Sequence, residues 1–159
     1  MSASIIKCIA TVNLRGEHEP KKELKPLVLK PDDGRVYPMG RMSAIFKADL
    51  EETDSTLSVS EWWLEGNTEG PYIHKHPEAH LFCVIEGSLA VYLQGKNWFE
   101  SEKGWYIYIP GGIEHCFENR SDNTVGFISI NTPGGFEKSI PHIVNYFEEN
   151  PSGDVKPSN

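Results

Sequence analysis

The sequence predicts an all-β protein whose short strands close into one barrel or sandwich. Short runs rich in β-branched and aromatic residues recur at close intervals, with glycine, proline or asparagine between them. These runs span residues 43–48, 57–65, 81–86, 89–93, 105–109 and 125–131. Closely spaced short strands separated by turn residues are typical of all-β barrels and sandwiches.

The strand runs occupy the middle of a chain of 159 residues, which is long enough to bury the core of one domain. Prolines and charged residues crowd the segment 21–38, as expected of a loop or of an arm laid over another surface. We therefore predict an N-terminal arm over residues 1–40 and a barrel over residues 41–138.

The C-terminal part has a different periodicity. Apolar residues recur there at helical spacing, at Ile140, Ile143, Val144 and Phe147. This spacing predicts a short amphipathic helix within residues 139–150. The polar residues 151–159 are expected to form a flexible tail.

Composition argues against several classes of partner. The formal net charge is −8 and no cluster of lysine and arginine stands out, so we expect neither nucleic-acid nor membrane binding. The three cysteines, Cys8, Cys83 and Cys116, are odd in number and far apart, which disfavours a disulfide framework. Lys7 interrupts the short apolar run at the N-terminus, so that run does not read as a signal peptide. We expect a cytoplasmic protein.

Four of the six histidines fall in two short segments at the ends of predicted strands. His74 and His76 are two residues apart, so both rings point to one face of an extended strand. His80 has the same parity after a short turn, and His115 is expected to come from a separate strand and to close the site. A barrel can bring such side chains around one interior point, where imidazole suits Zn, Cu, Fe or Ni.

A pair of histidines two residues apart is weak evidence by itself, because such pairs also occur on solvated strands. Here the pair is joined by two further histidines, and turns rich in glycine and proline frame both segments. The combination favours a metal site over a polar surface.

The first segment, Gly70 to Gly87, resembles the first signature motif of the cupin superfamily. That motif has a glycine, a spacer, His-x-His, three or four residues, a glutamate, six residues and a glycine. Here the spacer after Gly70 is shorter than usual and His80 stands at the glutamate position. The six residues between His80 and Gly87 fit the motif.

The second segment resembles the second cupin motif: glycine, five residues, Pro-x-Gly, two residues, histidine, three residues, asparagine. Every position fits, at Gly104, Pro110, Gly112, His115 and Asn119. The resemblance implies a double-stranded β-helix (jelly-roll) barrel with a single pair of motifs, of the quercetin-dioxygenase-like or four-histidine type.

The resemblance also implies one divalent ion of iron, zinc, nickel, manganese or copper inside the barrel. Its ligands would be His74, His76 and His115, with His80 either coordinating in place of the usual glutamate or standing back from the metal. Four neutral imidazoles do not offset the positive charge of the ion, so the ion would favour an anionic oxygen ligand.

An all-histidine site lacks a carboxylate that could act as a base. Glu61, on the predicted strand 57–65, and Tyr72, just before the ligand pair, are candidates for such a catalytic group. Tyr106 and Tyr108 lie on the strand before His115 and are further candidates. For each of them, filling the barrel wall or facing solvent is the alternative reading.

The first functional hypothesis is a dioxygenase acting on a small enol, diketone or phenolic substrate. Residues 132–137 are similar to a stretch of small bacterial cupins compared with quercetin dioxygenases. The second hypothesis is a non-redox isomerase, lyase or cyclase that uses the ion as a Lewis acid, a group in which four-histidine cupins occur. A metal-containing binding module for a small molecule is the third.

Single-barrel cupins commonly pair, so the resemblance also implies a homodimer. The N-terminal arm, over about residues 2–30, is expected to add to the sheet of a neighbouring copy.

Overall fold

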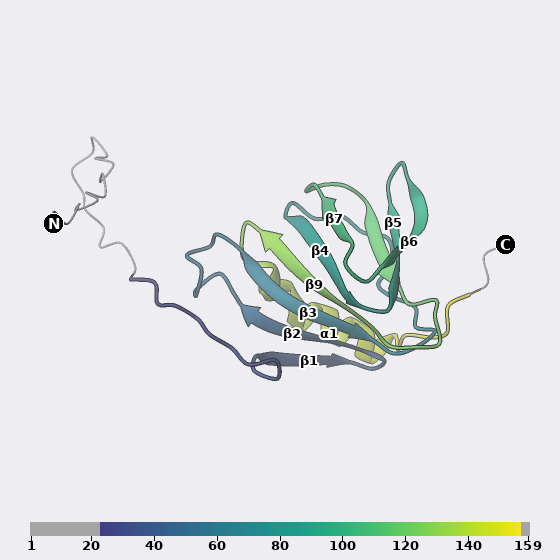
Figure 1. Ribbon diagram of the computed structural model, residues 1–159, viewed down its shortest axis with the longest axis horizontal. Helices are drawn as coiled ribbons and strands as arrows, with labels where there is room; N and C mark the ends of the chain where they lie inside the picture. Colours follow the sequence, from purple (N-terminus) through teal and green to yellow (C-terminus); the bar gives the residue numbers. More distant parts are fainter. Residues whose placement is uncertain (1–22, 157–159) are drawn as a thin grey trace, which may run out of the picture.

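The structure, a computed structural model, describes residues 23–156 and has two antiparallel sheets (Figure 1). One sheet has six strands in the order β1-β2-β3-β9-β4-β7, and the other has three in the order β6-β5-β8. In chain order the strands are β1 (Arg35–Met39), β2 (Met42–Ala48), β3 (Ser58–Leu64), β4 (Ala79–Glu86), β5 (Ser88–Leu93), β6 (Asn97–Glu102), β7 (Tyr106–Ile109), β8 (His115–Glu118) and β9 (Val125–Thr132). The predicted all-β jelly-roll class is confirmed.

The core lies between the two sheets and is rich in aromatic rings. The ring of Phe127 lies 4.8 Å from that of Phe82 and 4.9 Å from that of Phe117, measured between centroids. Trp62 joins the group at 5.8 Å from Phe117. All four side chains are buried, and burying such a ring contributes about 1.5–3 kcal/mol. These rings form the floor of the space in which the histidines lie.

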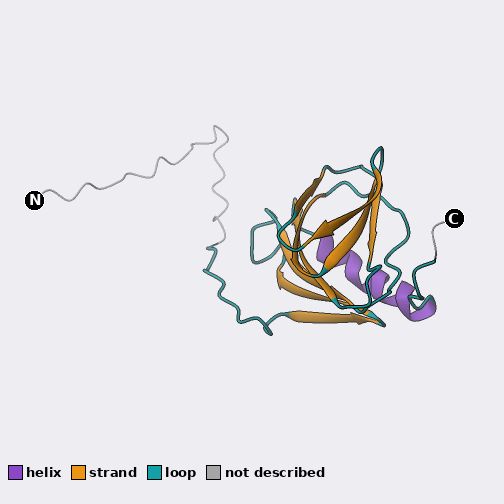
Figure 2. Cartoon of the chain, turned by 45° about the vertical axis from the view of Figure 1, so that its right-hand side comes forward, coloured by secondary structure: helices purple, strands orange, loops and turns teal. Residues whose placement is uncertain are grey.

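A short 3₁₀ helix, η1 (Phe136–Ser139), leads into α1 (Ile140–Glu149). The helix lies on the cavity side of the six-stranded sheet (Figure 2). Ile140 and Phe147 are its buried residues, and Pro141 occupies its first turn, where a missing N–H costs nothing. The predicted C-terminal helix is therefore present, and it closes one side of the barrel interior.

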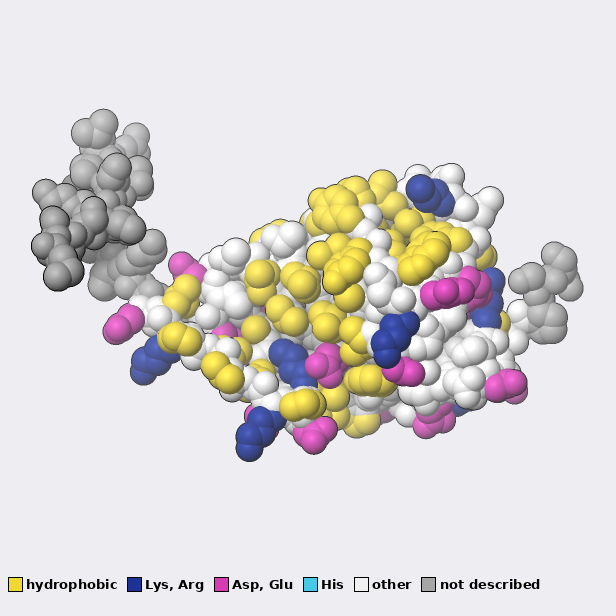
Figure 3. All heavy atoms as spheres, viewed as in Figure 1, with side chains coloured by type: hydrophobic (Ala, Val, Ile, Leu, Met, Phe, Trp, Pro, Cys, Tyr) yellow, Lys and Arg dark blue, Asp and Glu magenta, His cyan; other side chains and the backbone are white. Residues whose placement is uncertain are grey.

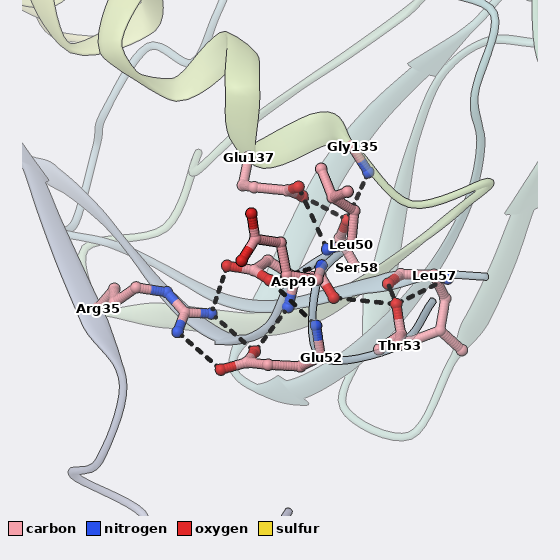
Figure 4. A network of polar contacts seen from close by, with 10 residues as sticks. Arg35, Asp49, Leu50, Glu52, Thr53, Leu57, Ser58, Gly135 and Glu137 are labelled. Carbon is pink, nitrogen blue, oxygen red and sulfur yellow. Dashed lines mark hydrogen bonds and ion pairs between the residues drawn. The ribbon is translucent and has the colours of Figure 1, made fainter. Parts of the chain in front are cut away.

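Glu137 ties η1 to the barrel (Figure 4). Its carboxylate accepts hydrogen bonds from Ser58 Oγ at 2.6 Å and from the Leu50 N–H at 3.2 Å. Beside it, Arg35 donates two hydrogen bonds of 3.0 Å to the carboxylate of Glu52. The start of β1, the β2–β3 loop and the entry to α1 are thus fixed to one another next to the cavity.

Two strands lie where the sequence did not indicate them. β1 falls inside the segment 1–40 that was predicted to be an arm, because Pro38 and flanking charges hide its pattern. β6 is polar, with the sequence NWFESE. The separate strand predicted for His115 is β8, which has only four residues after the turn at Gly111 and Gly112. The described part of the predicted arm that stays outside the sheets is residues 23–34.

Among residues 23–156, no helix has the length and apolar character needed to cross a membrane. A cytoplasmic location stays a prediction. The predicted tail falls partly on residues 157–159, which lie outside the described residues.

Candidate metal centre

A cavity of about 480 Å³ lies between the two sheets and under α1. Aromatic side chains form most of its walls, including Trp62, Phe82, Phe117, Phe127, Phe136 and Phe147. The polar groups that line it include all four predicted histidines, together with Glu78 and Ser129. An apolar pocket with a few convergent polar groups is the usual form of a small-molecule site.

The four histidines form one cluster. Ring centroids are 4.3 Å apart for His76 and His80, and 4.6 Å apart for His74 and His115. The centroid of His115 lies 5.0 Å from that of His76 and 5.2 Å from that of His80. One ring nitrogen from each of His74, His76 and His115 lies within 4.8 Å of the other two. The two predicted segments therefore meet at one point, as their spacing indicated.

Main-chain atoms hold His74 and His115 together. The His74 N–H donates to the His115 carbonyl at 3.1 Å, and the His115 N–H donates to the His74 carbonyl at 2.9 Å. The two rings are held alike: Nδ1 lies 2.8 Å from the Tyr72 carbonyl in one and 2.8 Å from the Ile113 carbonyl in the other. A carbonyl only accepts, so Nδ1 carries the proton and Nε2 of the neutral ring is free to bind a metal.

His76 is held by a carboxylate and by a tight turn. Its Nδ1 lies 3.1 Å from Glu78 Oε2, although off the direction of a good hydrogen bond, which leaves this buried nitrogen without a hydrogen-bond partner. The His76 carbonyl accepts from the Gly112 N–H at 2.8 Å. This contact depends on Gly111, since a Cβ there would lie 2.0 Å from the Pro77 carbonyl oxygen.

His80 lies on β4 and is only 4% exposed. Its Nε2 is 2.5 Å from Nε2 of His76, while its Nδ1 is 3.1 Å from Ser129 Oγ and 2.8 Å from Asn131 Nδ2. Asn131 Nδ2 also lies 3.1 Å from Nε2 of His80. An amide nitrogen only donates, so these contacts do not require a proton on Nδ1.

Asn131 and Ser129, which donates to Asn131 Oδ1 at 3.2 Å, together influence which nitrogen of His80 is available. When Asn131 donates to Nδ1, the proton of the neutral His80 ring sits on Nε2 and points to His76. Turning the amide by 180° exchanges its oxygen and nitrogen, so that Oδ1 accepts from Nδ1–H and Nε2 of His80 becomes free.

Burial favours the neutral form of three histidines in the cluster, His76, His80 and His115. It lowers the pKa of His80 to about 2 and the pKa of His115 to about 4, with repulsion from neighbouring histidines adding to the shift. The pKa of His76 is lowered too, first by burial and then by the charge of His74. A metal binds the unprotonated imidazole, so this donor set fits a divalent transition ion at neutral pH.

Three of the predicted catalytic candidates do not line the cavity: Glu61, Tyr106 and Tyr108. Glu61 faces the outer side of the six-stranded sheet, where its carboxylate lies 3.5 Å from Lys47 Nζ. Trp62 takes the inward direction on that strand and side chains alternate, so Glu61 does not face the interior, and of its two predicted roles the strand residue on the outer face agrees with the structure. Tyr106 and Tyr108 are 70% and 64% exposed on the same outer side, in agreement with the solvent-facing alternative and not with a catalytic role.

Tyr72, two residues before His74, lines the cavity at its entrance. Its ring centroid is 5.9 Å from that of His74 and 5.5 Å from that of Tyr146 on α1. It is 65% exposed, which places it at the entrance. A catalytic role for Tyr72 stays a prediction.

Sequence reasoning missed Glu78, Ser129 and Asn131. Glu78 has the same parity as His76 and His80, so the pattern that selected the histidines also pointed to it. Asn131 is opposite His80 because β4 pairs with β9 in that register, and Ser129 has the same parity on β9. Nothing in the local sequence of β9 reveals that pairing.

The fold and the cluster define a class: a double-stranded β-helix barrel with histidines converging on an interior cavity. Residues 61–131 match the family model described as the cupin domain, and both histidine segments lie within that range. This part of the chain is therefore similar to a cupin domain.

Similarity to individual proteins is more distant. The chain is 28% identical over 109 residues to a quercetin 2,3-dioxygenase of Bacillus subtilis (strain 168), a match that covers 67% of this chain and 32% of that protein. The chain therefore spans about a third of the length of this relative.

Two solved structures share the fold. An RmlC-like cupin from Shewanella frigidimarina NCIMB 400 superposes with a TM-score of 0.60 at 16% identity, covering 72% of this chain and 96% of that one. The polyketide cyclase RemF from Streptomyces resistomycificus gives a TM-score of 0.58 at 20% identity, covering 83% of this chain and 87% of that one.

Proposed function

We propose that this protein is a metal-dependent enzyme that acts on a small enol, diketone or phenolic substrate, and that it is a dioxygenase. The observation that carries the proposal is the convergence of four histidines on a cavity with aromatic side chains in its walls. The similarity to a quercetin 2,3-dioxygenase supports the choice of reaction.

The proposed ligands are His74, His76 and His115, with His80 as a fourth when Asn131 accepts its Nδ1 proton. When bound, the ion supplies a positive charge for an enolate or phenolate oxygen and, if redox-active, a partner for dioxygen. The hydrogen bonds from Nδ1 of His74 and His115 to main-chain carbonyls keep their Nε2 atoms directed to one point before anything binds.

The remaining parts of the cavity bind and shield the substrate. The cluster of aromatic rings that includes Phe82 and Phe127 favours a flat, apolar molecule over a sugar or a peptide. Phe136 lies in η1, just before the helix, and Phe147 lies on α1. Both side chains are buried over the cavity and keep water from that side. Glu78 positions His76 through its contact with Nδ1 and is the carboxylate among the cavity-lining groups.

A second candidate is non-redox catalysis by a cyclase, isomerase or lyase, with the ion acting as a Lewis acid. The observation that favours it is the imidazole of His80 at the position where the cupin motif has a carboxylate, which leaves the full charge of the ion. The fold likeness to a polyketide cyclase is compatible with this reaction and shows the fold alone.

Oxygen uptake separates the two candidates. The protein is loaded in turn with iron, manganese, nickel, copper and zinc, and mixed with flavonols and β-diketones in an oxygen electrode. The dioxygenase proposal expects one dioxygen consumed per substrate converted with a redox-active ion, and none with His115→Ala. Conversion that proceeds with zinc and without oxygen uptake would replace it by the Lewis-acid reaction.

A further inference from the structure

The cavity is lined by every histidine of residues 23–156, and one of these five lies outside the cluster. That residue is His142, on α1. As far as Figure 3 shows the described chain, the outer face of the six-stranded sheet presents hydrophobic, acidic and basic side chains and no histidine. The described histidines thus gather at one place, and His142 is the one for which metal binding gives no reason.

One face of η1 and α1 looks into the cavity. Its lining residues recur every three or four positions, which is helical spacing: Phe136, Ser139, His142, Ile143, Tyr146 and Phe147. Phe136 and Phe147 are buried, whereas His142 and Tyr146 are exposed. The face therefore turns phenyl rings to the interior, and an imidazole and a phenol to the entrance.

Ring contacts place the two ends of this face next to the cluster and next to its entrance. At one end, the ring centroid of Phe136 lies 5.4 Å from that of His80. At the other end, the ring centroid of Tyr146 lies 5.5 Å from that of Tyr72 at the entrance. His142 lies between these ends, one helical turn before Tyr146. Its imidazole is therefore beside the space in which a molecule bound between the cluster and the entrance would lie.

Both candidate reactions need a group that removes a proton. An enol or a phenol must lose its O–H proton, and a ketone must lose a C–H proton, before the oxygen carries a full negative charge. Such an oxygen is what a divalent ion attracts. The clustered histidines are the proposed ligands, and Glu78 is engaged with Nδ1 of His76. The base is therefore to be found among the other groups that line the cavity.

The other polar groups of the cavity leave one proton acceptor. Lys75 lies 4.0 Å from Glu114, and an ammonium group has no lone pair. The hydroxyls of serine and tyrosine are poor proton acceptors near neutral pH, whereas imidazole takes up and releases protons in this range. Within residues 23–156, no hydrogen bond or ion pair occupies the ring nitrogens of His142. His142 thus combines a suitable group with access to solvent.

We propose that His142 is the general base of this site, an inference that rests on the function proposed above. A neutral ring nitrogen takes the proton, and the N–H bond forms as the O–H or C–H bond of the substrate breaks. The electron pair of the broken bond stays on the substrate as the charge of an enolate or phenolate oxygen. The imidazolium then gives its proton to water at the entrance, which restores the neutral ring.

Exchange of hydrogen for deuterium tests the base without requiring dioxygen or a product. The zinc-loaded chain is mixed with benzoylacetone, a flat aromatic β-diketone, in deuterated buffer from which oxygen is excluded. Mass spectrometry follows the replacement of the C–H hydrogens between the two carbonyls. The unchanged chain is expected to accelerate exchange above the rate in buffer, and that acceleration should be about 100-fold smaller in His142→Ala. The variant should keep its zinc.

Asn145→Ala is the matched control. Asn145 is exposed on the same helix and does not line the cavity, so this variant should exchange as the unchanged chain does. Added imidazole should restore part of the exchange in His142→Ala and leave the unchanged chain unaffected. A merely structural role of His142 would not give this response.

Exchange that is equally fast in His142→Ala and in the unchanged chain would overturn the proposal, as would an unchanged chain that does not exceed the buffer. A loss in Tyr146→Phe without a loss in His142→Ala would assign the proton transfer to the phenol and overturn it as well. Substrate conversion with full oxygen uptake in His142→Ala would remove the base and leave the proposed function standing. Exchange that depends on His142, without any oxygen uptake, would keep the base and exclude the dioxygenase.

Discussion

His74 and His115 are held by main-chain atoms, whereas His76 and His80 are held by side chains. In the first pair, Nδ1 meets a backbone carbonyl two residues earlier, so the tautomer follows from the path of the chain. In the second pair, the partners are Glu78, Ser129 and Asn131, and the tautomer depends on which atoms these side chains present. One half of the cluster is thus fixed by the fold, and the other half can be tuned by substitution without disturbing the backbone.

The largest effect is expected from His115→Ala. This change removes a proposed ligand from the half that the main chain fixes, where we expect no neighbouring side chain to replace it. Losing the hydrogen-bond partner of a ligand typically lowers metal affinity about 10- to 100-fold. Losing His115 itself should lower the affinity by more than that. Isothermal titration with zinc or nickel measures the loss. His142→Ala, at an exposed position of α1 that also lines the cavity, is the control and should keep the affinity of the unchanged protein.

The next prediction compares Glu78→Gln with Tyr72→Phe. Glu78 acts on His76 through its side chain, so its loss should lower metal affinity by about 10- to 100-fold. Tyr72 contacts His74 Nδ1 through its main-chain carbonyl, which is still present in Tyr72→Phe. Tyr72→Phe should therefore bind metal as the unchanged protein does. Equal losses in both variants, measured by competition with a chelating dye, would contradict the division between the two halves.

Asn131→Asp should raise metal affinity, whereas the preceding variants lower it or leave it unchanged. A carboxylate only accepts, so it would keep the proton of His80 on Nδ1 and leave Nε2 free to coordinate. We expect a tighter site, by about 10-fold, with one more imidazole in the coordination shell. X-ray absorption at the metal edge counts the imidazoles. An unchanged count would mean that Asn131 does not control His80.

The smallest effect concerns the stability of the metal-free protein in acid. The pKa values of His80 and His115 are lowered to about 2 and about 4, against about 6.5 for an unfolded chain. Between these values the unfolded state binds more protons, so the free energy of unfolding should decrease as the pH falls from about 6.5 to 4. Urea titrations at several pH values measure the slope, which should be shallower in His80→Gln. An equal slope in that variant would contradict the assignment.

The sequence was sufficient for the parts of the site that depend on local geometry. The parity of His74, His76 and His80 is a property of one extended segment, and the second motif gives His115 with its turn. It failed where the strand had no clear inner face: Trp62 and Trp63 are adjacent aromatic residues, so the run 57–65 does not tell whether Glu61 or Trp62 points inward. Asn131 could not be predicted as the partner of His80 without the register of β4 against β9, which tertiary packing decides.

The central claim is that these histidines hold one divalent ion, and elemental analysis tests it most directly. The protein is purified without added metal, and its metal content per chain is measured by mass spectrometry beside that of His115→Ala and His142→Ala. The account predicts close to one transition-metal ion per chain in the unchanged protein and in His142→Ala, and a large loss in His115→Ala. A protein that holds no metal, even after incubation with each candidate ion, or a His115→Ala variant that keeps its ion, would contradict it.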